Sequence, residues 1–125
     1  MGGRLLLQAA HHEGLIVCSA CIAGEVPRKI LDGDLDGARE AAQWYHDLFG
    51  DDYYLELQRH EVKDPSVVAN RETFPLQQRA NRELIRLAKE LGIKLVCTND
   101  CHFEDKETAE AHDHLLCIST GKDLD

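Results

Sequence analysis

Three short apolar segments, separated by longer stretches of helical periodicity, constrain this chain more than any other feature. The apolar segments are residues 15–19, 53–58 and 94–98, and helical patterns cover 25–32, 34–49, 73–91 and 105–118. Successive apolar segments begin roughly 40 residues apart, which leaves room for a helix that crosses back over a sheet. We therefore predict an α/β fold with three parallel strands alternating with helices. Three strands are too few to close a barrel, so they form one flank of a sheet or part of a barrel.

Length and charge narrow the class of protein. The 125 residues correspond to one domain with a modest core. The formal net charge of −9, from 23 acidic and 14 basic residues, argues against nucleic-acid binding by this chain alone. No apolar run is long enough to span a membrane, and the first residues lack a signal-peptide pattern, so we expect a cytoplasmic protein. Residues 1–13 are assigned to a poorly defined N-terminal segment or to a remnant of protein expression.

The five cysteines indicate thiols and not a disulfide framework, because their number is odd and three belong to strand-like segments. We expect them to be reduced and buried. An alternative is a small zinc-binding module built from Cys18-x-x-Cys21 and Cys97-x-x-x-Cys101. The first spacing suits a zinc knuckle, whereas the second is one residue longer than usual. The alternative therefore stays open.

Polar, metal-binding residue types follow the predicted strands. The strand at 94–98 ends in Asp100-x-His102, Cys21 comes just after the first strand, and the second leads into the segment Gln58 to His60. The carboxyl ends of parallel strands meet at one edge of a sheet, where α/β folds usually hold their chemistry. Thiolate, carboxylate and imidazole groups are ligands of divalent metals. We therefore expect a metal site there. In the competing interpretation, Asp100 caps the next helix and His102 is a loop residue.

Four motifs in order resemble the PHP (polymerase and histidinol phosphatase) domain of bacterial replicative DNA polymerase III alpha subunits. They are Cys21-x-x-Gly24-Glu25, Tyr54-Leu55-Glu56-Leu57-Gln58-x-His60, Thr98-Asn99-Asp100-x-His102, and Ala111-His112-Asp113-x-Leu115-Leu116-Cys117-x-x-Thr120-Gly121-Lys122. The resemblance begins at about Glu13, so residues 14–125 are interpreted as the later portion of a PHP domain, leading toward the polymerase palm. It implies a partial PHP-type distorted (β/α)7 barrel.

The resemblance also implies roles for particular residues. Cys21, Asp100 and His102 align with metal ligands, and Asp100 and His102 would act in catalysis only through the metal. Glu56 and His60 lie in a shared motif, where His60 is either a residue that supports the ligands or a strand cap. The implied cofactor is a divalent metal: zinc, manganese or magnesium. The family's His-x-His pair and its other ligands are absent from this sequence, so we expect a fragment whose site is partial or empty.

Two classes of function follow from this resemblance. The parent protein would be a DNA-directed DNA polymerase, a nucleotidyltransferase, whose PHP domain is a metal-dependent phosphoesterase or 3′–5′ proofreading exonuclease. The alternative is a PHP domain that serves only as a structural scaffold. The expected partners are the rest of the polymerase chain and the replication holoenzyme subunits, with DNA bound through the parent protein and no membrane. We expect the fragment alone to be inactive on DNA and to associate, most simply as a homodimer, through uncovered strand edges.

Overall fold

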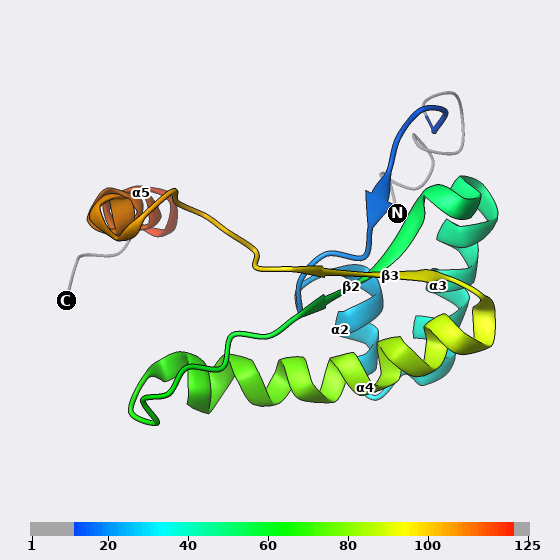
Figure 1. Ribbon diagram of the computed structural model, residues 1–125, viewed down its shortest axis with the longest axis horizontal. Coiled ribbons are helices and arrows are strands. Elements are labelled where there is room, and N and C mark those ends of the chain that lie inside the picture. The colour runs from blue at the N-terminus through cyan, green and yellow to red at the C-terminus, as the bar shows by residue number, and fades with distance from the viewer. Residues whose placement is uncertain (1–11, 122–125) are drawn as a thin grey trace.

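The three strands form one parallel sheet in the order β1-β2-β3 (Figure 1). The computed structural model describes residues 12–121, so the segment assigned to residues 1–13 lies almost entirely outside the described residues, as do residues 122–125. The strands are β1 (Val17–Cys18), β2 (Tyr53–Gln58) and β3 (Lys94–Thr98). Leu55 pairs with Leu95, and Gln58 pairs with Thr98. The prediction of three parallel strands alternating with helices is confirmed.

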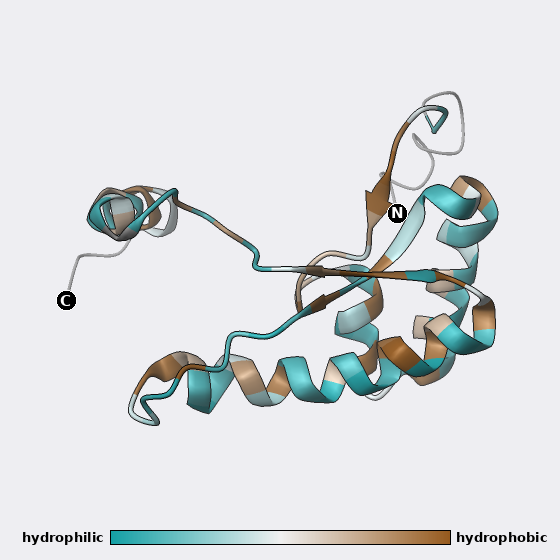
Figure 2. Cartoon of the chain, viewed as in Figure 1, coloured by the Kyte–Doolittle hydropathy of each residue, from teal (hydrophilic) through white to brown (hydrophobic). Residues whose placement is uncertain are grey.

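Three helices pack together on one side of this sheet (Figure 1). They are α2 (Glu25–Leu31), α3 (Leu35–Phe49) and α4 (Phe74–Leu91). The core between them consists of buried apolar residues from α2, α3, β2 and α4, together with Ile93: Val26, Ile30, Ala38, Ala41, Ala42, Phe49, Tyr53, Leu55, Ala80, Leu84, Leu87 and Ala88. Figure 2 shows hydrophobic residues in the strands and hydrophilic residues on much of the outer helix surface, as a one-sided core requires.

The helix ends follow the local signals in the sequence. Asp34 is the N-cap of α3, and its side chain accepts a hydrogen bond from the Gly37 backbone N–H at 2.9 Å. Gly92 ends α4 in the left-handed conformation, with φ of 70°. Thr73 begins the helical pattern predicted at 73–91 and precedes α4, but it makes no side-chain capping bond. A π-helical turn, η2 (Ala69–Thr73), runs into α4 instead, so the chain is already helical there.

The C-terminal helix lies apart from the other three. An extended segment after β3 leads to a short 3-10 turn, η3 (Lys106–Thr108), and then to α5 (Ala109–Thr120). Figure 1 shows this helix at the far end of the extended segment, away from the sheet. Its large apolar residues Leu115, Leu116 and Ile118 are exposed. None of the helices in residues 12–121 is both long and apolar enough to span a bilayer.

Two expectations about burial are wrong. The continuous apolar run 15–19 is typical of a strand covered on both faces, yet Leu15 and Ile16 are 45% and 71% exposed. The five cysteines are free, as expected, but Cys18, Cys97 and Cys101 are exposed. The physical reason is the position of the strands: β1 and β3 are the edges of this sheet, and each pairs only with β2 in the described residues. An apolar run reports that a segment prefers burial, but its neighbours decide how much burial it receives.

Candidate functional site

The residues singled out in the sequence follow the carboxyl ends of the three parallel strands. Cys21 lies after β1, His60 after β2, and Asp100 and His102 after β3. Because the strands are parallel, these ends belong to the same edge of the sheet. These residues therefore all lie in loops at the same edge of the sheet. Their side-chain contacts then divide them into separate groups.

The loop that carries Cys21 is a tight turn. The Gly24 backbone N–H donates to the Cys21 carbonyl at 2.8 Å, and Ala20 has a positive φ of 64°. A Cβ atom at Gly24 would lie 2.1 Å from the Ser19 carbonyl oxygen, so only glycine fits this close approach. The glycine of the Cys21-x-x-Gly24 motif thus has a structural reason. Glycine at this position allows the chain to turn tightly around Cys21, with Gly24 close to the Ser19 carbonyl.

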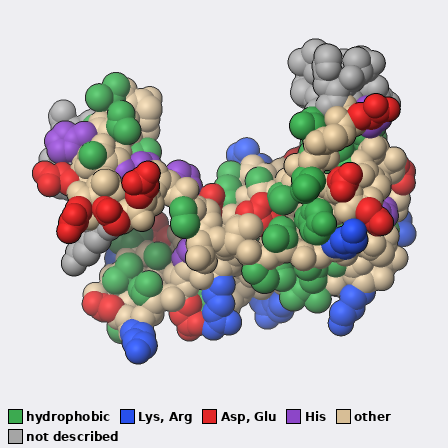
Figure 3. Space-filling view, turned by 45° about the horizontal axis from the view of Figure 1, so that its top comes forward, with side chains coloured by type: hydrophobic (Ala, Val, Ile, Leu, Met, Phe, Trp, Pro, Cys, Tyr) green, Lys and Arg blue, Asp and Glu red, His purple; other side chains and the backbone are tan. Residues whose placement is uncertain are grey.

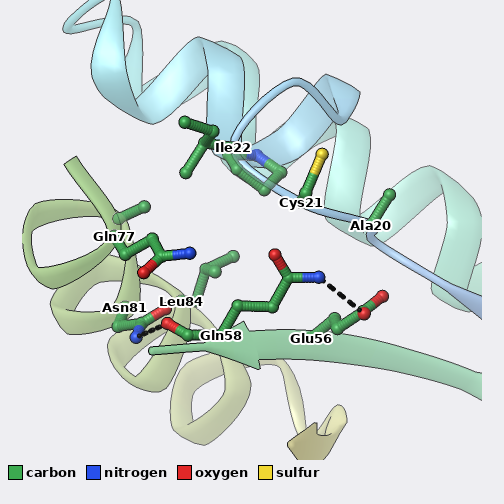
Figure 4. Close-up of a pocket in the computed structure, with 10 residues that line it drawn as sticks. Ala20, Cys21, Ile22, Glu56, Gln58, Gln77, Asn81 and Leu84 are labelled. Atoms are coloured by element: carbon green, nitrogen blue, oxygen red, sulfur yellow. Dashed lines mark hydrogen bonds between the residues drawn. The ribbon is translucent and has the colours of Figure 1, made fainter. Parts of the chain in front are cut away.

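Cys21 lines a small pocket between this loop, β2 and α4 (Figure 4). Glu56 and Gln58 of β2 and Gln77 and Asn81 of α4 line the same pocket. The Asn81 amide donates to the Gln58 backbone carbonyl at 2.9 Å, which attaches the end of β2 to α4. The pocket is therefore bounded by one thiol, one carboxylate and three amides.

Hydrogen bonds at the ends of β2 and β3 already engage the Glu56 carboxylate. It accepts from the Gln58 amide nitrogen at 3.0 Å and from the Thr98 hydroxyl. The Gln58 amide nitrogen also donates to the Thr98 oxygen at 3.2 Å, and the Glu56 backbone N–H donates to the Ser19 hydroxyl at 2.8 Å. Glu56 therefore joins β1, β2 and β3. Partial burial of the thiol raises the pKa of Cys18, and the negative charge of the Glu56 carboxylate raises it further.

The carbonyl oxygen of the Gln58 side chain has no hydrogen-bond partner among the described residues. Turning the amide over would place this oxygen against the Glu56 carboxylate, so the contacts determine its orientation. Figure 4 shows the oxygen pointing toward the loop that carries Cys21 and Ile22. An unpaired buried carbonyl costs about 1–3 kcal/mol. The position is therefore suited to a small hydrogen-bond donor such as a water molecule.

His60 contacts two separate elements through its ring. Its Nδ1 atom lies 2.8 Å from the Gln77 amide nitrogen, and its Nε2 atom lies 2.8 Å from the Asn99 carbonyl oxygen. The His60 backbone N–H donates to the Gln77 side-chain oxygen at 2.8 Å. His60 therefore connects α4 with the loop after β3. Gln77 was not predicted as a site residue, although a polar residue on the buried stripe of a helix was an available signal.

Asp100 and His102 lie in the loop after β3, and they line a second hollow with His112 and Leu116 of α5. Asp100 has a positive φ of 52°, and its carbonyl oxygen is 2.6 Å from His102 Nδ1. The His102 and His112 rings lie 5.7 Å apart between centroids. Figure 3 shows histidine and acidic side chains gathered around the end of the molecule that α5 forms.

The competing interpretation of Asp100 as a helix cap finds no support in the contacts. Asp105 caps the short turn η3 that leads into α5, because its carboxylate accepts from the backbone N–H groups of Glu107 and Thr108, both at 3.0 Å. Asp100 lies five residues earlier, in the left-handed conformation. Together with Ala20 it is one of two described non-glycine residues with positive φ. Both follow strand ends: Ala20 precedes the predicted ligand Cys21, and Asp100 is itself a predicted ligand. Backbone strain of this kind often accompanies function.

The donor types fit a divalent metal, but the described residues do not form a complete site. Thiolate and imidazole suit zinc, and carboxylate also suits manganese or magnesium. Within residues 12–121, however, no group of three or more His, Cys, Asp or Glu side chains is placed to hold a metal ion. Cys21 lines one hollow, and Asp100 and His102 line another. The cysteines of the alternative zinc module are not brought together either.

Comparisons with known proteins give one consistent family. A profile described as PHP domain matches residues 4–60. DNA polymerase III subunit alpha of Borreliella burgdorferi is 40% identical over 111 residues, covering 89% of this chain and 9% of that protein. The subunit of the same name from Treponema pallidum is 44% identical over 117 residues, covering 93% of this chain and 9% of the relative. The chain thus spans about a tenth of the length of these relatives.

Proposed function

Because the chain is homologous to the PHP region of bacterial DNA polymerase III alpha subunits, we propose that it is part of such a subunit and serves bacterial chromosome replication. The observation that carries this proposal is identity of 33–44% over about nine-tenths of the chain to DNA polymerase III alpha subunits from several bacteria. The parallel sheet with Cys21, Asp100 and His102 after its strand ends supports it. The parent protein would be a DNA-directed DNA polymerase, and it would act in the cytoplasm.

Within the parent protein, this segment would contribute Cys21, Asp100 and His102 to a metal-dependent phosphoesterase site. Sulfur, oxygen and nitrogen donors after successive strands support this role, and the incomplete donor set implies that further ligands come from outside these residues. A divalent metal bound there would supply hydroxide at neutral pH for cleavage of a phosphodiester, the chemistry of a 3′–5′ exonuclease. His102 is suited to ligation through Nε2, because its Nδ1 atom bonds to the Asp100 carbonyl.

A scaffold function is the second candidate, and a specific observation favours it. The Glu56 carboxylate, the acidic group nearest to the Cys21 pocket, is engaged by Thr98 and Gln58 and braces the sheet. In this alternative the segment would hold the rest of the polymerase and other holoenzyme subunits without catalysis. The net charge of −9 assigns DNA binding to other parts of the parent protein in either case.

Metal analysis and a nuclease assay of the full-length alpha subunit distinguish the two functions. The variants Cys21→Ser, Asp100→Ala and His102→Ala should each lower the bound metal and the release of nucleotides from a primer end. The matched controls are Asp113→Ala and His114→Ala, which change the same residue types on the exposed side of α5. Full metal content and full nuclease activity in all three site variants would exclude the ligand assignment. A wild-type subunit with neither metal nor nuclease activity would favour the scaffold.

A further inference from the structure

The contacts of His60 determine which of its ring nitrogens carries the proton. The Gln77 side-chain oxygen is occupied by the His60 backbone N–H at 2.8 Å, so the Gln77 amide nitrogen faces His60 Nδ1. An amide nitrogen can only donate, which makes Nδ1 the acceptor. The proton of the neutral ring must then lie on Nε2, where it is donated to the Asn99 carbonyl at 2.8 Å. All three hydrogen bonds are formed in this single arrangement.

Gln77 is well placed to hold this arrangement rigidly. It is 2% exposed, and it belongs to α4, whose neighbouring residues Ala80 and Leu84 are part of the hydrophobic core. Its amide contacts both the backbone and the ring of His60, so the ring has little freedom to rotate. A buried amide with both ends paired is costly to disturb, because each lost bond leaves an unsatisfied group.

The His60 Nε2 atom bonds to the peptide that precedes Asp100, a residue with a left-handed backbone conformation. The Asn99 carbonyl belongs to the peptide bond whose nitrogen is that of Asp100, and Asp100 has φ of 52°. A hydrogen bond to that carbonyl restrains the plane of the Asn99–Asp100 peptide, from which the Asp100 φ angle is measured. The Asp100 carbonyl belongs to the next peptide and lies 2.6 Å from His102 Nδ1. The two peptides that flank the Asp100 Cα atom therefore each contact a histidine ring, His60 on one side and His102 on the other. A left-handed aspartate persists only where its surroundings enforce it.

We propose that His60, held by Gln77, is a positioning residue that sets the loop Asn99–His102 and thereby presents Asp100 and His102. The inference rests on the proposed function only in assuming that the loop presents Asp100 and His102 to a metal. The restraint itself involves no metal and can be measured on this chain alone. It assigns to the histidine of the Gln58-x-His60 motif a task distinct from ligation.

The test uses nuclear magnetic resonance on the ¹⁵N-labelled 125-residue chain. The ring nitrogen shifts should show the proton of neutral His60 on Nε2, and the backbone order parameters of residues 99–102 should be near those of the strands, about 0.85. The variant His60→Leu removes the donor, and the order parameters of residues 99–102 should fall below about 0.6. The conservative variant His60→Gln retains an N–H at the position of Nε2 and should restore them.

His46→Leu is the matched control. The ring of His46 also contacts a backbone carbonyl, that of Gly50 at 3.1 Å, but it lies at the end of α3 before β2 begins. Its loss should leave residues 99–102 unchanged. If His60→Leu disrupts the sheet resonances, Gln77→Met replaces it, because this variant removes only the contacts to His60 and should mobilise the same loop.

Three results would overturn the proposal: a proton on Nδ1 of neutral His60, unchanged order parameters in the variants that lose the contact, or an equal loss in His46→Leu. Each of these leaves the metal assignment of Asp100 and His102 intact. Conversely, unchanged metal content in Asp100→Ala and His102→Ala of the full-length subunit would refute the proposed function, and it would leave the restraint by His60 standing. The two failures are therefore distinguishable.

Discussion

The hydroxyl group of Thr98, at the end of β3, donates a hydrogen bond to the carboxylate of Glu56 in β2. The same hydroxyl accepts from the Gln58 amide nitrogen at 3.2 Å, so three side chains on one face of the sheet form a closed set. Thr98 pairs with Gln58 in the strand register, which brings these groups together. The set connects the strand that precedes Asp100 to the strand that precedes His60. It therefore fixes the relative positions of the two loops.

Replacing Thr98 by valine tests this connection, because valine keeps the shape of the side chain and removes the hydroxyl. Glu56 would lose one donor while the Gln58 amide remains, and we expect a loss of about 1 kcal/mol in the free energy of unfolding. Thr98→Ser retains the hydroxyl and should lose less. Urea unfolding of both variants measures the difference. Equal stability of the valine and wild-type proteins would show that the contact contributes nothing.

The Cys18 thiol should react slowly with alkylating reagents, and Glu56 should be part of the reason. Although Cys18 as a whole residue is exposed, partial burial of its thiol raises the pKa of Cys18, and the negative charge of Glu56 raises it further. A higher pKa leaves less thiolate at a given pH, and the thiolate is the reactive form. Glu56→Gln removes the charge and should accelerate alkylation of Cys18 at pH 8, read by mass spectrometry. Cys117 on α5 is the internal control, and an equal acceleration there would contradict the explanation.

Asp34 should make the stability of α3 depend on pH. The Gly37 backbone N–H lowers the pKa of Asp34 below its usual range, and the hydrogen bond from Lys29 lowers it further. Because the folded pKa lies below the unfolded one, ionised Asp34 stabilises the fold above the unfolded pKa of about 3.9. That contribution is lost as the pH falls through the lower folded value.

The urea midpoints of wild type and Asp34→Ala should therefore differ by a constant amount near neutral pH and converge in acid. Asp36→Ala, which changes an acidic residue in the first turn of the same helix, is the control. A difference between wild type and Asp34→Ala that persists unchanged below the folded pKa would show that the charge of Asp34 is not responsible.

Gly24→Ala should destabilise the turn beneath Cys21. The added Cβ would meet the Ser19 carbonyl at 2.1 Å, and this backbone oxygen cannot move without shifting the end of β1. We expect a loss of about 1–3 kcal/mol in the free energy of unfolding, as for other overpacked sites. Gly33→Ala is the comparison, because its added Cβ meets nothing within 4 Å and only its φ of 85° is unfavourable. A smaller loss at Gly24 than at Gly33 would contradict the steric explanation.

The chain should associate in solution. Ile16 and Ile118 are 71% and 81% exposed, and the outer edges of β1 and β3 are unpaired in the described residues. Figure 3 shows hydrophobic side chains exposed on the face it presents. Open edges beside apolar side chains favour pairing with another chain, so sedimentation should show dimers or larger species. Ile16→Lys should shift the distribution toward monomer, whereas a monodisperse monomer of the wild-type chain across a wide concentration range would refute the expectation.

Local patterns predicted most of the secondary structure. The ranges 53–58 and 94–98 are the observed strands β2 and β3. Asp34, Gly50 and Gly92 lie at the ends of the helices predicted at 34–49 and 73–91. These signals succeed because alternation, capping and glycine conformations depend on neighbouring residues alone. The first strand was overestimated, because the length of an edge strand depends on the partner it finds.

By itself, the sequence determined the fold class, the family and the edge on which the polar residues lie, since periodicity and motif order are properties of the chain. Only the tertiary structure decided which of those residues meet. His60 joins Gln77, 17 residues away, to Asn99, 39 residues away. Thr98 reaches Glu56 across 42 residues. Such contacts depend on strand register and on the direction of each side chain, which no local pattern encodes, because packing across the whole domain sets both.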